Sequence, residues 1–215
     1  PYIDVRVSFN SFVPSNLDDK IAGRLVDYYL DKLVSQPNLH DKIEFEVVLS
    51  CYTFDLRNNL CDLKKYGFSK TEQNSIAESL LNLTNEILHP QTGLWRKDAD
   101  KLEILTAKFN TLKASNLTPV EKIYWLLEDT KRYGTLPFAG LARAGFIAVQ
   151  MMKSMVSMSV LSQDDHDAFI GSISTVSSQL ARDRVSLDKT SFLARYGHLR
   201  PGTYDILSAR YDENP

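Results

Sequence analysis

Apolar side chains recur at intervals of three and four residues over most of this chain, and this helical period constrains its fold more than any other feature. The clearest stretch follows a capping pair, Ser69 and Glu72, and continues to Pro90. A second capping pair, Thr118 and Glu121, starts another helix. The expected helices span about 18–34, 69–90, 95–112, 118 onward, 137–161, 162–184 and 188–196. The sequence therefore predicts a mainly α-helical, bundle-like domain.

Two short runs alternate apolar and polar residues instead, which is the period of a strand with one buried face. They lie at about 3–9 and 43–49, and we expect them to pair as a minor two-stranded β element near the N-terminus. With the helix between them, they could form a small α/β layer over residues 1–55. No repeat or Gly/Ser-rich linker divides the chain, so we expect one helical domain over residues 1–215.

The sequence starts inside an alternating run, without an initiator methionine, so we expect this domain to be a piece of a larger multidomain protein. Its 25 basic and 27 acidic residues nearly cancel, which argues against nucleic acid as a partner. Cys51 and Cys61 are too few for a disulfide-rich secreted scaffold, and neither they nor the four histidines have metal-ligand spacing. With no leader and no uninterrupted apolar run of about twenty residues, we expect a cytoplasmic domain without a membrane contact or a metal.

Small residues over 139–148 include Gly140 and Gly145, which have the spacing of a phosphate-binding loop. Phe146 and Ile147 stand where that loop needs Lys and Ser or Thr, so the sequence predicts no nucleotide site here. Glycine and alanine more simply allow a neighbouring helix to approach closely. Arg143 is the exception in this run, because a guanidinium at this position must reach solvent, pair with a carboxylate or face a ligand.

The segment YGHLRPGTYD, at 196–205, holds the densest mixture of polar and aromatic side chains in the sequence. His198, Arg200, Tyr204 and Asp205 stand there around two glycines. Ordering such a loop costs conformational entropy without much apolar burial in return. It is either a binding site or a structured connection whose glycines serve helix caps and turns.

Several stretches spread over nearly the whole chain carry a family resemblance. They are PYIDVR at 1–6, FNSF at 9–12, KIEFE at 42–46, CYTFD at 51–55, RYGTLPFA at 132–139 and YGHLRPGTYD at 196–205. Together they resemble the middle region of bacterial proteins of the phosphoenolpyruvate synthase and pyruvate phosphate dikinase family, including its rifampicin phosphotransferase-like branch. In that family an ATP-grasp module makes a phosphohistidine on a small mobile domain, which swings to a second site where the acceptor is bound. The resemblance implies that this chain is the acceptor-side helical domain between the two modules.

The resemblance also implies that this domain carries no phosphohistidine and that it binds other domains of the parent protein. His198 lies between Gly197 and Leu199, which departs from the Gly-Gly…Ser-His loop of the mobile domain, so it is not assigned as the phosphocarrier. The expected partners are the flanking ATP-grasp and phosphohistidine domains and a small-molecule acceptor. ATP and magnesium are expected in the parent, whereas this chain should bind no cofactor and should be inactive when isolated.

Two functions of different classes follow. The first is a substrate-binding domain of a phosphotransferase, in which guanidinium groups clamp a phosphate or carboxylate. Its candidate arginines are Arg6, Arg132, Arg143 and Arg200. His198, Tyr204 and Asp205 could orient the acceptor or move its proton, and no residue is assigned as catalytic. The second is a non-catalytic helical spacer or interaction domain that docks the flanking modules.

Overall fold

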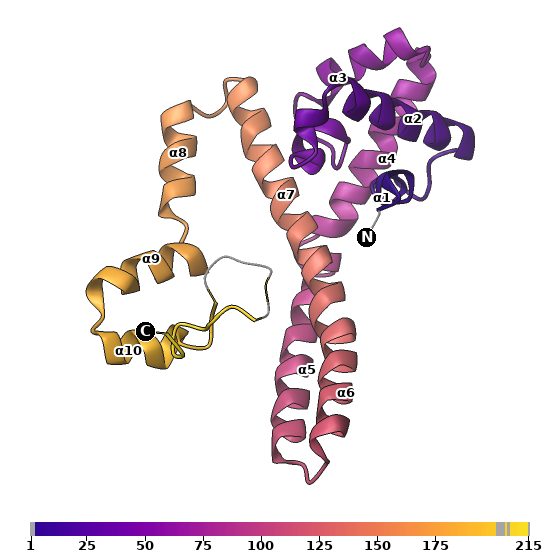
Figure 1. Cartoon of the computed structure of the whole chain (residues 1–215). Helices are drawn as coiled ribbons and strands as arrows, with labels where there is room; N and C mark the ends of the chain where they lie inside the picture. The colour runs from indigo at the N-terminus through magenta and orange to yellow at the C-terminus, as the bar shows by residue number, and fades with distance from the viewer. Residues whose placement is uncertain (1–2, 201–204, 206, 215) are drawn as a thin grey trace. The chain divides into compact units, whose positions relative to one another are not determined.

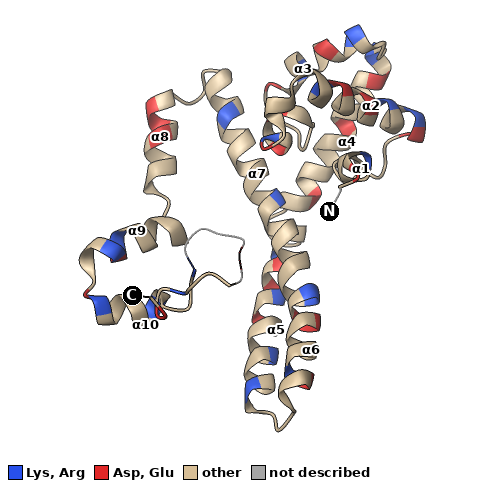
Figure 2. Cartoon of the chain, in the orientation of Figure 1, with Lys and Arg blue, Asp and Glu red and all other residues tan. Residues whose placement is uncertain are grey.

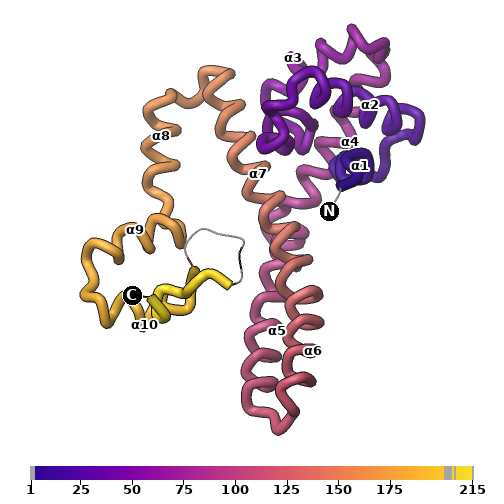
Figure 3. The backbone as a smooth tube through the Cα atoms, in the orientation of Figure 1, coloured from indigo at the N-terminus to yellow at the C-terminus, as the bar shows by residue number. Residues whose placement is uncertain are grey.

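The computed structural model describes residues 3–200, 205 and 207–214, and the chain forms two compact units. The first is Pro1–Ser162 and the second is Gln163–Pro215 (Figures 1 and 3). Every regular element in the described residues is a helix, and none is a strand. The predicted mainly helical class is therefore confirmed.

Helices of very different lengths make up the two units. The α-helices of the first unit are α1 (Val5–Asn10), α2 (Asp19–Ser35), α3 (Leu56–Asn59), α4 (Lys70–Leu88), α5 (Leu94–Ala114), α6 (Pro119–Asp129) and α7 (Leu136–Ser157). Its shorter turns are the 3-10 helices η1 (Pro37–Leu39) and η3 (Leu60–Tyr66) and the π-helices η2 (Ile43–Val47) and η4 (Thr130–Thr135). The second unit contains α8 (Gln163–Ser172), α9 (Val176–Ser186) and α10 (Lys189–Tyr196).

The first predicted strand is wrong, because its residues form helix α1. Asp4 caps this helix by accepting a hydrogen bond from the backbone N–H of Val7 at 3.2 Å. Phe9 is its buried anchor and packs edge-on against Tyr29, with the ring centroids 6.0 Å apart. Of the other apolar residues of the alternating run, Ile3 and Val7 are exposed and Val5 is partly buried against the core. The alternation therefore does not mark the buried face of a sheet.

The second predicted strand is also wrong, because its residues form the π-helix η2. The hydrogen bonds of this turn are local: the N–H of Val48 donates to the carbonyl of Ile43 at 3.0 Å, and that of Glu46 to Lys42 at 2.8 Å. A strand needs a paired neighbour, and the only other candidate is helical. The two-stranded β element and the α/β layer over residues 1–55 are therefore absent from the part of the chain that the structure describes.

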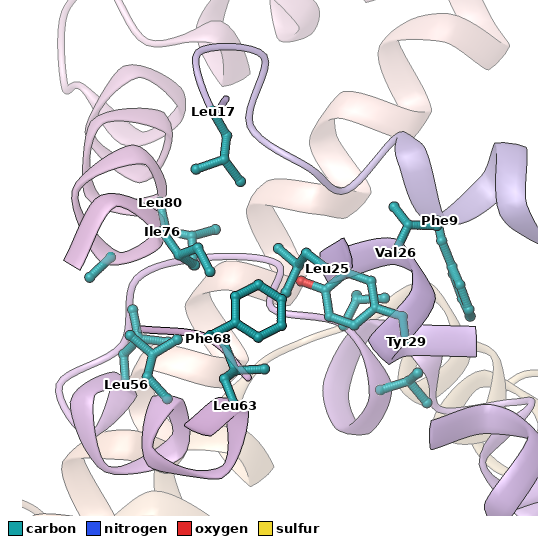
Figure 4. Close-up of a cluster of buried hydrophobic side chains, with 14 residues drawn as sticks. Phe9, Leu17, Leu25, Val26, Tyr29, Leu56, Leu63, Phe68, Ile76 and Leu80 are labelled. Atoms are coloured by element: carbon teal, nitrogen blue, oxygen red, sulfur yellow. The ribbon is translucent and has the colours of Figure 1, made fainter. Parts of the chain in front are cut away.

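An apolar core lies at the centre of the N-terminal part of the first unit (Figure 4). Leu25 and Tyr29 of α2 meet there with Leu63 of η3 and with Ile76 and Leu80 of α4, all almost completely buried. The apolar stripes predicted on α2 and α4 from their helical spacing are thus confirmed. Both predicted capping boxes, at the starts of α4 and α6, are present as well.

Helices α6, η4 and α7 join into one continuous helix from Pro119 to Ser157. The sequence predicted that a separate helix opens at Pro137, since proline lacks a backbone N–H. Instead, the wider π-turn η4 lies directly before this proline, and the N–H of Leu136 donates to the carbonyl of Lys131. Because Pro137 cannot donate a backbone hydrogen bond, the helix stays continuous here through this irregular turn.

By length and composition, the Pro119–Ser157 helix is the one helix in the described residues that could cross a membrane. Charged residues, among them Glu121, Glu128 and Arg132, interrupt its first half. Ile147 and Ser154 in its second half are buried inside the first unit. Only 11% of its most apolar stretch is buried, and a single helix of this kind is weak evidence of a membrane span.

Helix α5 runs back along α6 and the first turns of α7 as an antiparallel hairpin (Figure 1). Lys108 and Asp129 form an ion pair across it at 3.1 Å. Gly140 lies where α7 and α5 approach closely, because a Cβ atom at this position would collide with the side chain of Asp98. The predicted packing role is therefore confirmed at Gly140, whereas Gly145 has open space around it.

The buried carboxylate of Asp183 organises the second unit. It accepts hydrogen bonds from the Tyr196 hydroxyl at 2.7 Å, from Arg195 at 2.8 Å and from Gln179 at 2.6 Å. These contacts hold α9 against α10. The Tyr196 hydroxyl, followed by Gln179 and Arg195, lowers the pKa of Asp183 below its usual range.

We expect the second unit to lose stability in acid as Asp183 is protonated. Since folding lowers the pKa of this carboxyl, its contribution is present above the unfolded value of about 3.9 and is lost as the pH falls through the lower folded value. Thermal unfolding, followed by the NMR signals of the Tyr196 ring between about pH 6 and pH 2.5, measures this loss. Asp183→Asn should be less stable at neutral pH and should lose much of this acid dependence. An unchanged acid profile in that variant would assign the dependence to other groups.

Candidate functional site

Two of the predicted anion-binding arginines form ion pairs on the surface of the first unit. Arg6 of α1 pairs with Asp27 of α2 at 2.6 Å. Arg132 of η4 pairs with Glu128, one turn earlier, at 3.4 Å. Both guanidinium groups are exposed. These two arginines have partners that explain them without a ligand.

Arg143 lies half-buried on α7. Its Nη1 donates to the carbonyl of Ser11 at 3.3 Å, and its guanidinium lies 5.8 Å from the centre of the Phe12 ring. Its Nε and Nη2 are shielded from solvent and have no hydrogen-bond partner among the described residues. Burial lowers the pKa of Arg143, and charge on the nearby Cys51 thiol would oppose this shift. The guanidinium thus has unmet hydrogen-bonding capacity, but it lines none of the larger pockets of the described residues.

The remaining predicted site residues belong to the second unit, except Tyr204, which lies outside the described residues. The Nε of Arg200 donates to the carbonyl of Ser208 at 2.7 Å and closes the loop onto the C-terminal segment. Asp205 accepts from a backbone N–H two residues further on, at 2.9 Å. His198 is exposed and borders an open hollow of about 480 Å³. Arg200 and Asp205 therefore have local structural contacts.

A row of polar residues on one face of α7 holds the irregular chain that follows η2. The side-chain amide of Gln150 donates to two carbonyls of η2, at 3.0 and 3.4 Å. The Ser154 hydroxyl accepts from the N–H of Phe54 at 3.3 Å, and Ser157 donates to Asp55 at 2.7 Å. Each bond joins positions about a hundred residues apart in the sequence. The C-terminal half of α7 therefore fixes the path of residues 44–55.

Two other helices hold the same segment from within the core. The N–H of Leu49 donates to the phenol oxygen of Tyr29 in α2 at 3.1 Å. The N–H of Tyr52 donates to the hydroxyl of Thr84 in α4 at 2.9 Å. Burial raises the pKa of Tyr29 far above its usual range, so this phenol stays protonated. The segment 44–55, which is irregular after η2, is thus anchored by three helices.

The anchored segment borders a cavity of about 380 Å³, which we call the polar pocket. Residues of α2, η2, α3, η3 and α7 complete its walls. Its polar and charged side chains are Tyr28, Lys32, Glu46, Ser50, Thr53, Asp55, Asn59, Asp62, Gln150, Lys153, Ser154 and Ser157. This size is in the range of sites for small molecules.

Two lysines of the polar pocket lack an ion-pair partner. Neither Lys32 nor Lys153 forms a salt bridge with a carboxylate of the described residues. Burial lowers the pKa of Lys32, while the charges of Glu46 and Asp62 act in the opposite direction. The ammonium group of Lys153 lies 5.2 Å from the centre of the Phe45 ring. An anion in this pocket would meet two cationic groups without direct salt-bridge partners, together with the carboxylates of Glu46, Asp55 and Asp62.

The sequence carried a signal for only part of this pocket. Ile147, Gln150, Ser154 and Ser157 recur at intervals of three and four residues, so they share one face of α7. A polar row on a helix that is otherwise apolar is a reason to expect a polar contact. The lysines had no comparable signal, because an unpaired lysine is recognised only from the positions of its neighbours.

Other chemical features are limited in the residues that the structure describes. No group of three His, Cys, Asp or Glu side chains there could hold a metal ion. Cys51 is a buried free thiol and Cys61 an exposed one, and burial raises the pKa of Cys51. No protein-family model, curated protein or solved structure matches this chain. The chemistry of the polar pocket therefore has to be argued from its own residues.

Proposed function

We propose that this chain is the acceptor-binding helical domain of a cytoplasmic, ATP-dependent phosphotransferase similar to phosphoenolpyruvate synthase, and that its polar pocket receives the acceptor. The observation that carries the proposal is the pair of pocket lysines, Lys32 and Lys153, neither of which forms a salt bridge with a described carboxylate. The sequence resemblance supports the reaction class, and the pocket supplies a place for an anionic small molecule.

An anionic group placed between the two lysines offsets the cost of keeping Lys32 charged in a half-buried position. The phenol of Tyr28 and the amide of Asn59, which also line the pocket, can donate further hydrogen bonds to it. The carboxylates of Glu46, Asp55 and Asp62, which also line the pocket, repel a second anion and favour a hydroxyl or an amine. The acceptor class is therefore a small molecule with one phosphate or carboxylate and one neutral or basic polar end.

In this proposal the chain binds and orients the acceptor and performs no chemical step alone. The phosphoryl group comes from the flanking ATP-grasp and phosphohistidine domains of the parent, where ATP and magnesium are bound. Positioning an acceptor is a large part of what a phosphotransferase must do. The isolated chain should neither hydrolyse ATP nor become labelled by it, and it has neither nucleic acid nor a membrane as a partner.

The site residues predicted from the sequence have different roles in this proposal. Arg6 and Arg132 are left out of the pocket by their surface ion pairs. Arg143 supports the α7 side of the first unit through Ser11. His198, Arg200, Tyr204 and Asp205 stay a separate proposed acceptor contact of the second unit, which rests on the sequence resemblance.

Replacing either pocket lysine with methionine should weaken anion binding about tenfold, because it removes one of two unpaired charges. Methionine keeps most of the length of the side chain and of its packing. The probes are inorganic phosphate and phosphoenolpyruvate, titrated separately into the labelled chain. Shifts of the Ser50 and Cys51 backbone NMR signals, together with isothermal calorimetry, locate and measure the binding.

Lys20→Met provides the matched control, since Lys20 is an exposed lysine on the same helix as Lys32 and lies outside the pocket. This variant should bind both probes as the unchanged chain does. The proposal is wrong if Lys32→Met and Lys153→Met bind like the control, or if neither probe moves the pocket signals. Binding of phosphoenolpyruvate but not of phosphate would assign the site to the carboxylate.

A spacer domain is the second candidate function, and one observation favours it. The continuous helix from Pro119 to Ser157 is 39 residues long, so it extends about 58 Å. A helix of that length could hold two flanking modules at a fixed separation. The lysine titrations discriminate between the candidates, because a spacer needs no anion site.

A further inference from the structure

The side chains that line the polar pocket carry one more negative than positive charge. Lys32 and Lys153 stand there with three carboxylates, those of Glu46, Asp55 and Asp62. Figure 2 shows that α7, which contributes Lys153, carries basic residues only, whereas α2 carries charges of both signs. An acceptor whose only charge is negative would make the pocket more negative still. A positive charge on the same acceptor would correct this balance.

The hydroxyl groups of the polar pocket present hydrogen-bond acceptors to a ligand. Each hydroxyl has a single proton, and the protein already uses it. Thr53 and Ser157 both donate to the carboxylate of Asp55, at 2.7 Å. Ser50 donates to the carbonyl of Glu44 at 3.2 Å. The oxygens keep lone pairs, so these walls bind a group with several N–H donors better than they bind another acceptor.

Glu46 is the pocket carboxylate that has no partner of its own. Asp55 accepts from two hydroxyls, and Asp62 is paired with Lys65 at 2.8 Å. Glu46 forms no salt bridge and no side-chain hydrogen bond within the described residues. Burial lowers the pKa of Lys32 and the charge of Glu46 opposes this, so the two side chains lie near each other. Places for an anion and for a cation are therefore close together in one pocket.

The fold holds the turn that carries Glu46 in place. Val47, the next residue of η2, is buried in the apolar core. On the other side, Gln150 of α7 donates to the carbonyls of Glu44 and Phe45. The backbone beneath Glu46 is therefore already ordered before a ligand arrives, which lowers the entropy that binding costs.

We propose that the acceptor is a zwitterion, whose phosphate or carboxylate lies between Lys32 and Lys153 and whose ammonium group is held by Glu46 and by the hydroxyl oxygens of the pocket. This inference rests on the proposed function, because the anionic end uses the same two lysines. It narrows the second end of the acceptor to a protonated primary amine. The three N–H donors of such a group match walls that offer acceptors.

Two probes of nearly the same size test the ammonium group. O-Phosphoethanolamine carries a phosphate and an ammonium, and hydroxyethyl phosphate carries a hydroxyl in place of the amine. At about pH 7 and low ionic strength, we expect the full chain to bind O-phosphoethanolamine about tenfold more tightly, because only this probe forms charge-assisted bonds with the carboxylates. Isothermal calorimetry measures both affinities, and the backbone NMR signals of Ser50 and Cys51 locate the binding.

Glu46→Gln should reduce this preference by at least about threefold and should not weaken the binding of hydroxyethyl phosphate. Glutamine keeps the size of the side chain and removes only its charge. Glu44→Gln is the matched control, since Glu44 belongs to the same turn and does not line the pocket. This variant should keep the preference. Circular dichroism shows whether each variant keeps its helices.

The outcomes separate this inference from the proposed function. Equal affinity for the two probes overturns the zwitterion and leaves the anion site in place. A preference that Glu46→Gln does not reduce also overturns it. If neither probe binds in the polar pocket, both the zwitterion and the proposed function are wrong.

Discussion

Ile147→Ala should lower the free energy of unfolding of the first unit by about 2–4 kcal/mol. Ile147 is 0% exposed and packs with Ile87 of α4 and with Cys51 in a small second cluster. Its removal leaves a cavity at the point where α7 meets the rest of the unit. Urea denaturation, followed by the fluorescence of Trp95 and Trp125, measures the change, since both tryptophans belong to the first unit.

Ile147 also lies on the face of α7 that carries Gln150, Ser154 and Ser157. We therefore expect Ile147→Ala to weaken anion binding in the polar pocket, although this side chain does not line it. Ile3→Ala is the matched control, because Ile3 is 79% exposed and should change stability by less than about 0.5 kcal/mol. Equal losses in the two variants would contradict the proposed docking of α7.

Gly93→Ala should destabilise the first unit by about 1–3 kcal/mol. Gly93 is the buried N-cap residue directly before α5, and its N–H donates to the carbonyl of His89 at 2.9 Å. A Cβ atom at this position would lie 2.5 Å from the carbonyl oxygen of His89 and 2.6 Å from that of Ile87. Both are backbone atoms, so the turn between α4 and α5 would have to shift. Thermal and urea denaturation report the loss.

Gly145→Ala provides the opposite outcome from the same chemical change. Gly145 lies inside α7, and nothing stands within 4 Å of a Cβ atom placed there. Alanine should therefore stabilise the helix by up to about 1 kcal/mol, since it reduces the conformational freedom of the unfolded chain. If both substitutions shifted stability in the same direction, the close approach at Gly93 would not be the cause.

The parts of the fold that follow from local chemistry could be predicted from the sequence. The capping boxes at Ser69 and Thr118 and the apolar stripe through Ile76 and Leu80 involve residues close together in the chain. The strand predicted from the alternating run at 43–49 was wrong, because a strand exists only with a paired neighbour and pairing is not a local property. The helix start predicted at Pro137 was also wrong, because the π-turn before this proline keeps the helix continuous.

The polar pocket could not be predicted as a site, because its walls come from distant parts of the sequence. Lys32 of α2 and Lys153 of α7 meet at one cavity only after residues 44–55 have been fixed between them. The sequence pointed instead to individual arginines, of which Arg6 and Arg132 are explained by surface ion pairs. Whether a charge is neutralised depends on the folded positions of its neighbours, and spacing in the sequence does not supply them.

The polar pocket and the tip of the α5–α6 hairpin share one structural element, the continuous helix from Pro119 to Ser157. Gln150 and Ser157 lie near one end of the continuous helix, and Pro119 forms the other end. Because the helix is about 58 Å long, a tilt of about 5° at the pocket moves the tip by about 5 Å. If the helix tilted as one body around a bound molecule, a small adjustment at the pocket would therefore displace the hairpin tip far enough to change the contacts made there.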